Sequence, residues 1–349
     1  MDKQSTPPPP PVPEMVIFEV HLVNNRSQLF ANNNQQLQLH IHAQKQIWMN
    51  NAFHDVPLSQ NEIRSLRLIR NDTGNIHNWS SDSQRNPRFR SAEDTPPNAF
   101  IHELTSIDQD IAPVFHEQVE NYQDVSSGEI FDSSDVAVPM RHQVISIWLR
   151  SSVRETASFV ARMVMDGASS ETRSPSARAV TIQSVAPRRI HARDLDREWR
   201  SYFDENVFWD KIYWWSLYIT YLRFPPNSPP MIEGPVLTGG AFLSGRPNLR
   251  NIFQGGRRLA DVVAHPTINT IWTSEIRNGF TARPENNAQP VHIRPSNQWP
   301  IRILQYYENP NDHATISREV FVSFIDVDGN THRYRIRITG ATNVDVSDA

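Results

Sequence analysis

Cysteine is absent from the chain. Its absence excludes disulfide bonds, structural zinc sites with thiolate ligands and catalysis by a thiol nucleophile. The absence of cysteine does not indicate the cellular compartment of the protein, because a chain without cysteine tolerates oxidising and reducing surroundings equally. The sequence also has no run of about 18 apolar residues, the length that a membrane-spanning helix needs, so we expect no transmembrane segment.

The N-terminal sequence, MDKQSTPPPPPVPEM, lacks the apolar stretch that is typical of a secretory signal. We therefore expect synthesis in the cytoplasm without a signal peptide. Release from the cell would then require lysis or a dedicated export machine.

Lysine is scarce. It occurs only at Lys3, Lys45 and Lys211, so arginine supplies the other 31 of the 34 basic residues. Three interpretations stay open: mutational drift, arginine pairing with carboxylates at subunit interfaces, and a toxin that avoids ubiquitination in a host cytosol. The net charge of −4 argues against nucleic acid as a partner.

Proline is concentrated at the start of the chain, where five consecutive prolines precede Val12 and Pro13. Such a run favours polyproline II and cannot enter the interior of a sheet or helix. We predict that residues 1–13 form a disordered tail. It serves either as a stiff spacer or as an arm that docks onto a neighbouring subunit.

The following segments have the pattern of β-strands. Met15–Val23 is rich in β-branched and aromatic residues, and apolar and polar side chains alternate along Gln35–Ala43. In Leu58–Arg70, Ser59 and Glu62 have the spacing of a helix capping box. With long polar loops, these segments predict a first β-sandwich over residues 14–138.

Residues 27–43 resemble the opening of a bacterial immunoglobulin-like module of the invasin type. The resemblance rests on Ser27–Asn33, which is followed by the alternating strand. It implies an immunoglobulin-like β-sandwich and no particular activity.

A second series of strands begins after residue 138 and predicts a second β-sandwich over residues 139–349. Its first strands are Gln143–Leu149, Ala157–Met165 and Ala177–Gln183. Between them and the later strands, Leu195, Trp199 and Tyr202 recur at helical spacing. We therefore predict one short amphipathic helix near residues 194–203.

Ile212–Phe224 is the most hydrophobic stretch of the chain, and both faces of the strand that it predicts are apolar or aromatic. Burial on both sides is one interpretation. Exposed aromatic side chains would instead stack on sugars or form a subunit interface. Tyr213 and Trp215 are therefore candidate partner-binding residues.

His40 and His42 project from the same side of their predicted strand, about 7 Å apart. Two imidazoles on one face are either part of an exposed polar surface or two ligands of a metal, whose third ligand, such as His21 or His54, the sequence does not place. We predict no metal site, with His40 and His42 as the only candidates. The run Asp326–Asn330 predicts a hairpin turn rather than a calcium loop, because Arg337 stands where such a loop needs an acid.

Arg333, Arg335 and Arg337 alternate with apolar residues, so three guanidinium groups line one face of the last predicted strand. They form a solvated outer face or recognise carboxylates or phosphates on a partner. The near-neutral charge of the chain favours a neighbouring copy of the same protein over nucleic acid.

Together these patterns predict a mostly β protein with two immunoglobulin-like β-sandwich units, one short helix and a disordered tail. Sequence inspection reveals no catalytic triad, cofactor loop or metal cluster, so an enzyme is the least favoured reading. We expect a non-enzymatic structural protein that self-assembles into a homo-oligomer or a larger array. The alternative is a bacterial toxin, effector or adhesin-like module that binds a host surface, a glycan or a membrane.

Overall fold

The structure is a computed structural model that describes residues 13–49, 51–100, 142–166, 171–205, 215–243, 246–255, 258–263, 270–272, 290–295, 297–308, 316–339 and 343–349. The predicted tail, apart from Pro13, lies outside these residues. The chain divides into a first unit, residues 1–186, and a second unit, residues 187–349. No helix in the described ranges has the length and apolarity needed to cross a membrane. As predicted, the fold is mostly β, with sheets packed in sandwich-like layers.

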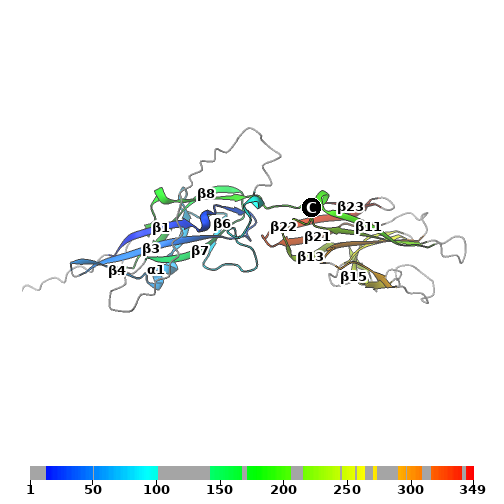
Figure 1. The fold of residues 1–349 in the computed structure, drawn as a ribbon, viewed down its shortest axis with the longest axis horizontal. Helices are drawn as coiled ribbons and strands as arrows, with labels where there is room; N and C mark the ends of the chain where they lie inside the picture. Colours follow the sequence, from blue (N-terminus) through cyan, green and yellow to red (C-terminus); the bar gives the residue numbers. More distant parts are fainter. Residues whose placement is uncertain are drawn as a thin grey trace, which may run out of the picture. The chain divides into compact units, whose positions relative to one another are not determined.

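The first unit contains two sheets (Figure 1). The first sheet has the order β1-β3-β7-β6, and β4 extends it along β3. Its strands are β1 (Pro13–Leu22), β3 (Leu37–Met49), β7 (Gln143–Ser151), β6 (Trp79–Asp82) and β4 (Ala52–Val56). All of their pairings are antiparallel. Antiparallel sheets commonly pack one face on the core and expose the other to solvent.

The second sheet of this unit has the order β2-β10-β8-β5, and β9 pairs with β8. Its strands are β2 (Gln28–Phe30), β10 (Val180–Val185), β8 (Glu155–Val164), β5 (Arg67–Arg70) and β9 (Glu171–Arg173). The inner faces of the two sheets form one apolar core, which includes Val20, Leu37, Leu39, Ile41, Leu149, Leu29, Leu68, Phe159, Met163 and Ile182.

The predicted boundary near residue 138 is wrong. Strands β7, β8 and β10 lie after that residue, yet β7 pairs with β3, β8 with β5 and β10 with β2. Long-range pairing therefore places them in the first unit, whose boundary lies at residues 186 and 187. Strand spacing along the sequence does not reveal which distant strand completes a sheet.

A buried ion pair connects strand β3 to the one α-helix in the described ranges, α1 (Gln60–Ser65). Lys45 Nζ donates to Glu62 Oε1 at 2.8 Å, and the two side chains are 8% and 0% exposed. Glu62 also accepts from the backbone N–H groups of Ser59 and Asp166. The Ser59 hydroxyl in turn accepts from the backbone N–H of Glu62, so the predicted capping box is confirmed.

The second unit pairs a seven-stranded sheet with a four-stranded sheet. The larger sheet contains β11 (Asp196–Glu205), β12 (Trp215–Arg223), β19 (Ile301–Glu308), β16 (Arg258–Val263), β15 (Arg246–Gly255), β14 (Ala241–Leu243) and β20 (Ile316–Ser317). The smaller sheet contains β13 (Met231–Gly239), β21 (Val320–Asp326), β22 (Thr331–Thr339) and β23 (Asn343–Asp348). β17 (Thr270–Trp272) and β18 (Pro290–His292) form a separate pair. Leu222, Ile303, Val322, Phe324 and Tyr334 belong to the core of this unit.

The predicted helix at residues 194–203 is wrong. A 3-10 turn spans Ala192–Asp194, and the residues after it form β11, which pairs with β12 from Asp196 opposite Arg223 onward. Leu195 is buried, whereas Trp199 is 55% exposed, so the two side chains do not form one apolar helical face. Ladder hydrogen bonds to β12 therefore outweigh a weak local helical pattern.

The hairpin predicted at residues 326–330 is confirmed between β21 and β22. Gly329 has a φ of +80°, a conformation that glycine adopts without strain. The buried carboxylate of Asp326 accepts from the backbone N–H of Asn330 at 2.8 Å and lies 3.0 Å from Nε2 of His332. Nδ1 of His332 accepts from the backbone N–H of Ile190 at 3.2 Å, so the imidazole joins the turn to the start of the unit.

We expect Lys45→Met to destabilise the first unit by about 3–5 kcal/mol, because it leaves the carboxylate of Glu62 buried without its cation. Urea denaturation or calorimetry of the whole chain measures this loss. Arg193→Met is the matched control: Arg193 is 81% exposed in its ion pair with Asp194, and its loss should cost at most about 0.5 kcal/mol. Equal effects of the two substitutions would contradict a structural role for the buried pair.

Candidate functional site

The side of the first sheet that faces away from the core carries a continuous row of polar and aromatic side chains. We call it the outer face. Its residues are Gln36, which directly precedes β3 and is buried, and along β3 Gln38, His40, His42, Gln44, Gln46 and Trp48. From Leu37 to Lys45 the residues between them are buried. At about 3.3 Å per residue, this row extends for about 40 Å.

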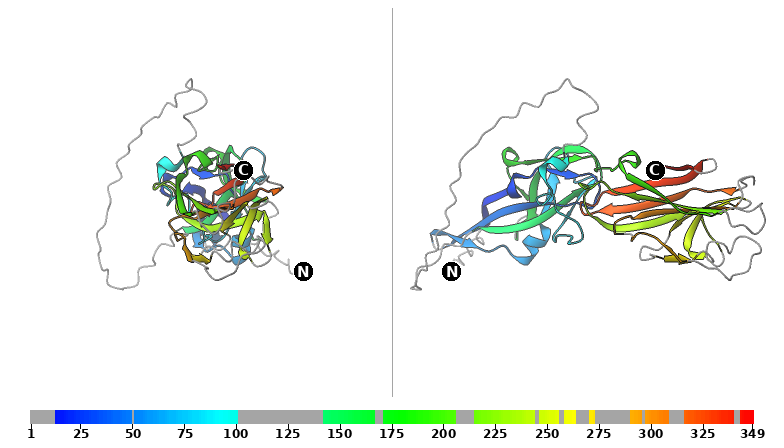
Figure 2. Two further views of the ribbon diagram at one scale, coloured as in Figure 1. Left: turned by 90° about the vertical axis from the view of Figure 1, so that its right-hand side faces the viewer. Right: turned by 45° about the vertical axis from the view of Figure 1, so that its right-hand side comes forward.

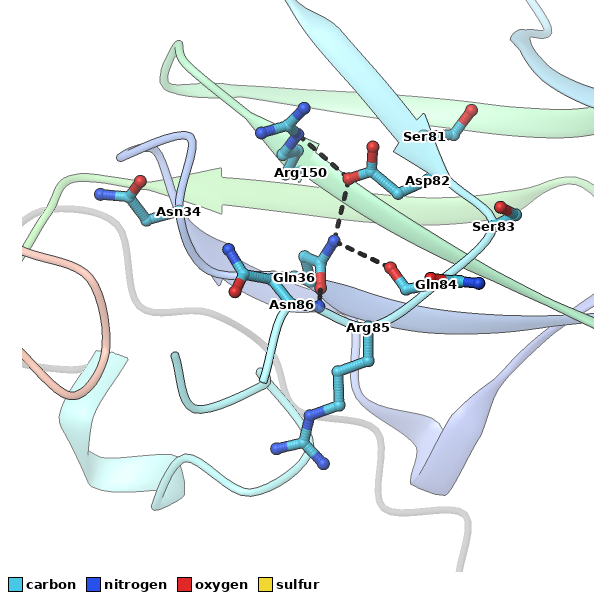
Figure 3. A pocket seen from close by; sticks show the side chains of 9 residues that line it. All are labelled: Asn34, Gln36, Ser81, Asp82, Ser83, Gln84, Arg85, Asn86 and Arg150. Atoms are coloured by element: carbon cyan, nitrogen blue, oxygen red, sulfur yellow. Dashed lines mark hydrogen bonds and ion pairs between the residues drawn. The ribbon is translucent and has the colours of Figure 1, made fainter. Parts of the chain in front are cut away.

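A polar pocket of about 530 Å³ occupies one end of the outer face (Figure 3). Oδ2 of Asp82 accepts from Nε2 of Gln36 at 2.9 Å and lies 3.2 Å from Nε of Arg150. Oε1 of Gln36 accepts from the backbone N–H of Asn86 at 2.6 Å. Asp82 is the one carboxylate among the nine lining residues, and Arg150 and Gln36 already engage it. The pocket therefore offers hydrogen bonds more readily than acid–base chemistry.

Four imidazoles gather in the middle of the outer face. The ring centroids of His21 and His42 are 4.5 Å apart, those of His42 and His142 are 4.8 Å apart, and those of His40 and His42 are 6.4 Å apart. The placement of His40 and His42 on one side of the strand is thus confirmed. The β1–β3 register brings in His21, whereas His54 lies on β4 opposite Ile47.

Sequence reasoning missed His142, which directly precedes β7, because the pairing of β7 with β3 cannot be read from either segment alone. The rings of His42 and His142 stack at an interplanar angle of 21°. Nitrogen lone pairs lie in the ring plane, so stacked rings do not aim them at a common point. Within the described ranges, no group of three or more His, Asp or Glu residues is arranged to hold a metal ion.

The surroundings of His42, at the centre of the cluster, disfavour its protonated form. Burial lowers the pKa of His42, and positive charge on His21, His142 and His40 lowers it further. Glu19, on β1 opposite His42, acts in the other direction. A hydrogen bond from Arg178 holds the pKa of Glu19 below its usual value. The neutral form of the His42 ring is therefore favoured in the folded chain.

Exposed apolar side chains lie at the other end of the outer face, where the β3–β4 hairpin extends past the end of β7 (Figures 1 and 2). Trp48 and Phe53 pair across the hairpin and are 49% and 55% exposed; we call them the hairpin patch. Met49, which is 41% exposed, lies on the opposite side of β3. The rings of Trp48 and Phe53 meet edge to face at 4.8 Å. Beside them, the side-chain amides of Gln44 and Gln46 donate to Asp55 at 2.9 Å and lower its pKa.

Arg333, Arg335 and Arg337 share one side of β22, as their alternation predicts. Each already contacts a neighbouring strand. Arg337 Nε donates to Asp345 at 2.6 Å, Arg335 Nε donates to Ser347 at 3.2 Å, and the Arg333 guanidinium lies 4.6 Å from the ring centroid of Phe321. Contact with a partner stays a prediction for these three residues.

Of the aromatic candidates, Tyr213 lies outside the described residues, and Trp215 is the first residue of β12. Further along β12, Ile219, Tyr221 and Leu222 are buried, which confirms burial on both faces of this part of the strand. Tyr218 stacks on the exposed Trp199 of β11 at 5.0 Å and 19°. Partner binding by Tyr213 and Trp215 stays a prediction.

Two arginines at the larger sheet of the second unit were not predicted from the sequence. Arg302 is 1% exposed, and burial lowers its pKa to about 10. Arg294 binds both carboxylate oxygens of Glu198, at 2.5 and 2.7 Å, and its guanidinium lies 4.9 Å from the ring centroid of Trp299. These contacts indicate a structural role for the two arginines.

No protein-family model matches the sequence, and neither does any curated protein. Among solved structures, the adhesin InvE of Yersinia pseudotuberculosis aligns with 92% of the chain at 8% identity and a TM-score of 0.17. The chain spans 58% of the length of that structure. Similarity at this level carries no argument about fold or function.

The stability of the first unit should fall in mild acid because of His42. Its folded pKa lies below the unfolded value of about 6.5, so the unfolded chain takes up the proton first. The stability is therefore full above that value and declines as the pH falls towards the folded pKa.

His42→Gln should reduce the loss of melting temperature between about pH 7.5 and pH 5.5. His77→Gln, at an exposed position outside the cluster, is the control and should leave the loss unchanged. Thermal melts at both pH values measure the effect. An undiminished loss in His42→Gln would show that the cluster is not its source.

Proposed function

We propose that the chain is a non-enzymatic binding protein that associates with further copies of itself through the first unit. The single observation that carries this proposal is the hairpin patch. Trp48 and Phe53 stand next to each other on a hairpin that extends beyond β7, and each leaves about half of its side chain exposed.

Aromatic side chains in this setting are typical of a contact surface. Tryptophan is strongly enriched among the residues that dominate the energy of protein interfaces. Gln44, Gln46 and Asp55 place a polar rim directly beside the two rings. An apolar centre with a polar border is the arrangement that protein interfaces generally have.

Chemical features of the outer face favour binding over catalysis. The carboxylate of Asp82 in the polar pocket is ion-paired to Arg150, and burial together with the neighbouring histidines lowers the pKa of His42. An edge position for β4, which pairs with β3 alone among the described strands, adds backbone groups that a second chain can use.

We expect the wild-type chain to elute as a dimer or larger species in size-exclusion chromatography with light scattering. The double substitution Trp48→Ser and Phe53→Ser should convert it to a monomer, because each buried aromatic anchor contributes about 2 kcal/mol or more to an interface. Trp199→Ser removes an equally exposed tryptophan from the second unit and should leave the mass unchanged. A wild-type monomer at every concentration would rule out self-association.

Glycan binding is a second candidate, favoured by the Trp199–Tyr218 stack. Trp199 is 55% exposed and lies on β11, at the end of the larger sheet. Its ring is held parallel to Tyr218 at 5.0 Å, which orients the opposite ring face for contact with the apolar side of a sugar.

A glycan array probed with the wild-type chain tests this candidate. Trp199→Ala should weaken any binding by about tenfold or more, whereas Trp48→Ala, the matched control in the first unit, should not. Equal binding by wild type and Trp199→Ala, or binding to no glycan, would remove the candidate.

A further inference from the structure

We propose that the hairpin patch is the docking site for the proline-rich segment, residues 7–12, of a second copy of the chain. This inference rests on the proposed function and adds the identity of the segment that covers the patch. It follows from where that segment leaves the first sheet, from its chemistry and from its reach.

The proline-rich segment leaves the sheet beside the patch. Pro13 is the first residue of β1 and pairs with Ile47, the residue before Trp48. In two copies whose hairpins face each other, each segment would therefore start next to the patch of its partner. Such an exchange is isologous and closes with twofold symmetry.

The chemistry of the two surfaces matches. Prolines carry no N–H donor, but their rings are apolar and their carbonyl groups are strong acceptors. Aromatic-lined surfaces recognise polyproline II segments by packing rings between prolines. Trp48 and Phe53 supply an edge-to-face aromatic pair, and the indole N–H of Trp48 is a donor for a carbonyl group.

A second copy fits better than the chain's own segment. The backbone at Pro13 lies in the plane of the sheet, where it pairs with β3. The side chains of Trp48 and Phe53 instead project from the face of the sheet. A stiff proline run cannot turn from the edge onto that face within one or two residues. Residues 7–12 would extend for about 19 Å at about 3.1 Å per residue, a distance that reaches an adjacent molecule.

A complementation experiment tests this inference. One variant lacks residues 1–12, which precede β1, and keeps the patch. The other keeps the segment and carries Trp48→Ser and Phe53→Ser. Light scattering should show a monomer for each variant alone and a heterodimer for their equimolar mixture, because only the mixture contains both a free segment and a free patch.

A labelled peptide of residues 1–13 supplies a direct binding measurement. It should bind the deletion variant, and binding should weaken at least tenfold when the same variant also carries Trp48→Ser and Phe53→Ser. A control peptide with serine in place of Pro7–Pro11 should bind at least tenfold more weakly.

The outcomes separate this inference from the proposed function. If the deletion variant associates like the wild type while the patch variant does not, self-association stands and the proline segment is not the occupant. A wild-type monomer whose deletion variant still binds the peptide means that each segment covers its own patch, which overturns the exchange. Failure of the peptide to bind the deletion variant overturns the docking itself.

Discussion

The alternation of side chains along β3 is the constraint on which the first unit depends. Leu37, Leu39 and Ile41 face the core. Lys45 lies on the same side of β3 and forms the buried ion pair with the carboxylate of Glu62. A shift of one residue would exchange this row for the polar row of the outer face. The buried ion pair opposes such a shift, since a displaced Lys45 would leave Glu62 without its cation. A fixed register is what holds the histidines and Trp48 on one surface.

Local signals in the sequence predicted the parts of the fold that depend on neighbouring residues. The capping box of Ser59 and Glu62, the alternation along β3 and the turn at Asp326–Asn330 all appear in the structure. Each of these features is specified within a few residues by hydrogen bonding, periodicity or turn chemistry. The prediction for residues 194–203 failed because the apolar spacing there was short, and pairing with β12 decided the conformation.

Features that depend on distant pairing were not predictable. His21, His42 and His142 meet because β1 and β7 lie on opposite sides of β3, and no single segment contains that information. The same reason explains the misplaced unit boundary. The exposure of Trp48 and Phe53 could not be predicted, because an aromatic pair near a turn is equally compatible with a buried core. Their exposure follows from the pairing of β7 with β3, which ends at Ala43. The arginines of β22 show the reverse, since their spacing was clear but their contacts with Asp345, Ser347 and Phe321 were not.

The central claim is that the far end of the outer face is a contact surface between copies of the chain. Hydrogen–deuterium exchange at low and high protein concentration tests it without any substitution. The account predicts that amides of residues 46–56 become more protected as concentration rises, while those of α1 and the core of β3 stay unchanged. Exchange of residues 46–56 that is independent of concentration would contradict it.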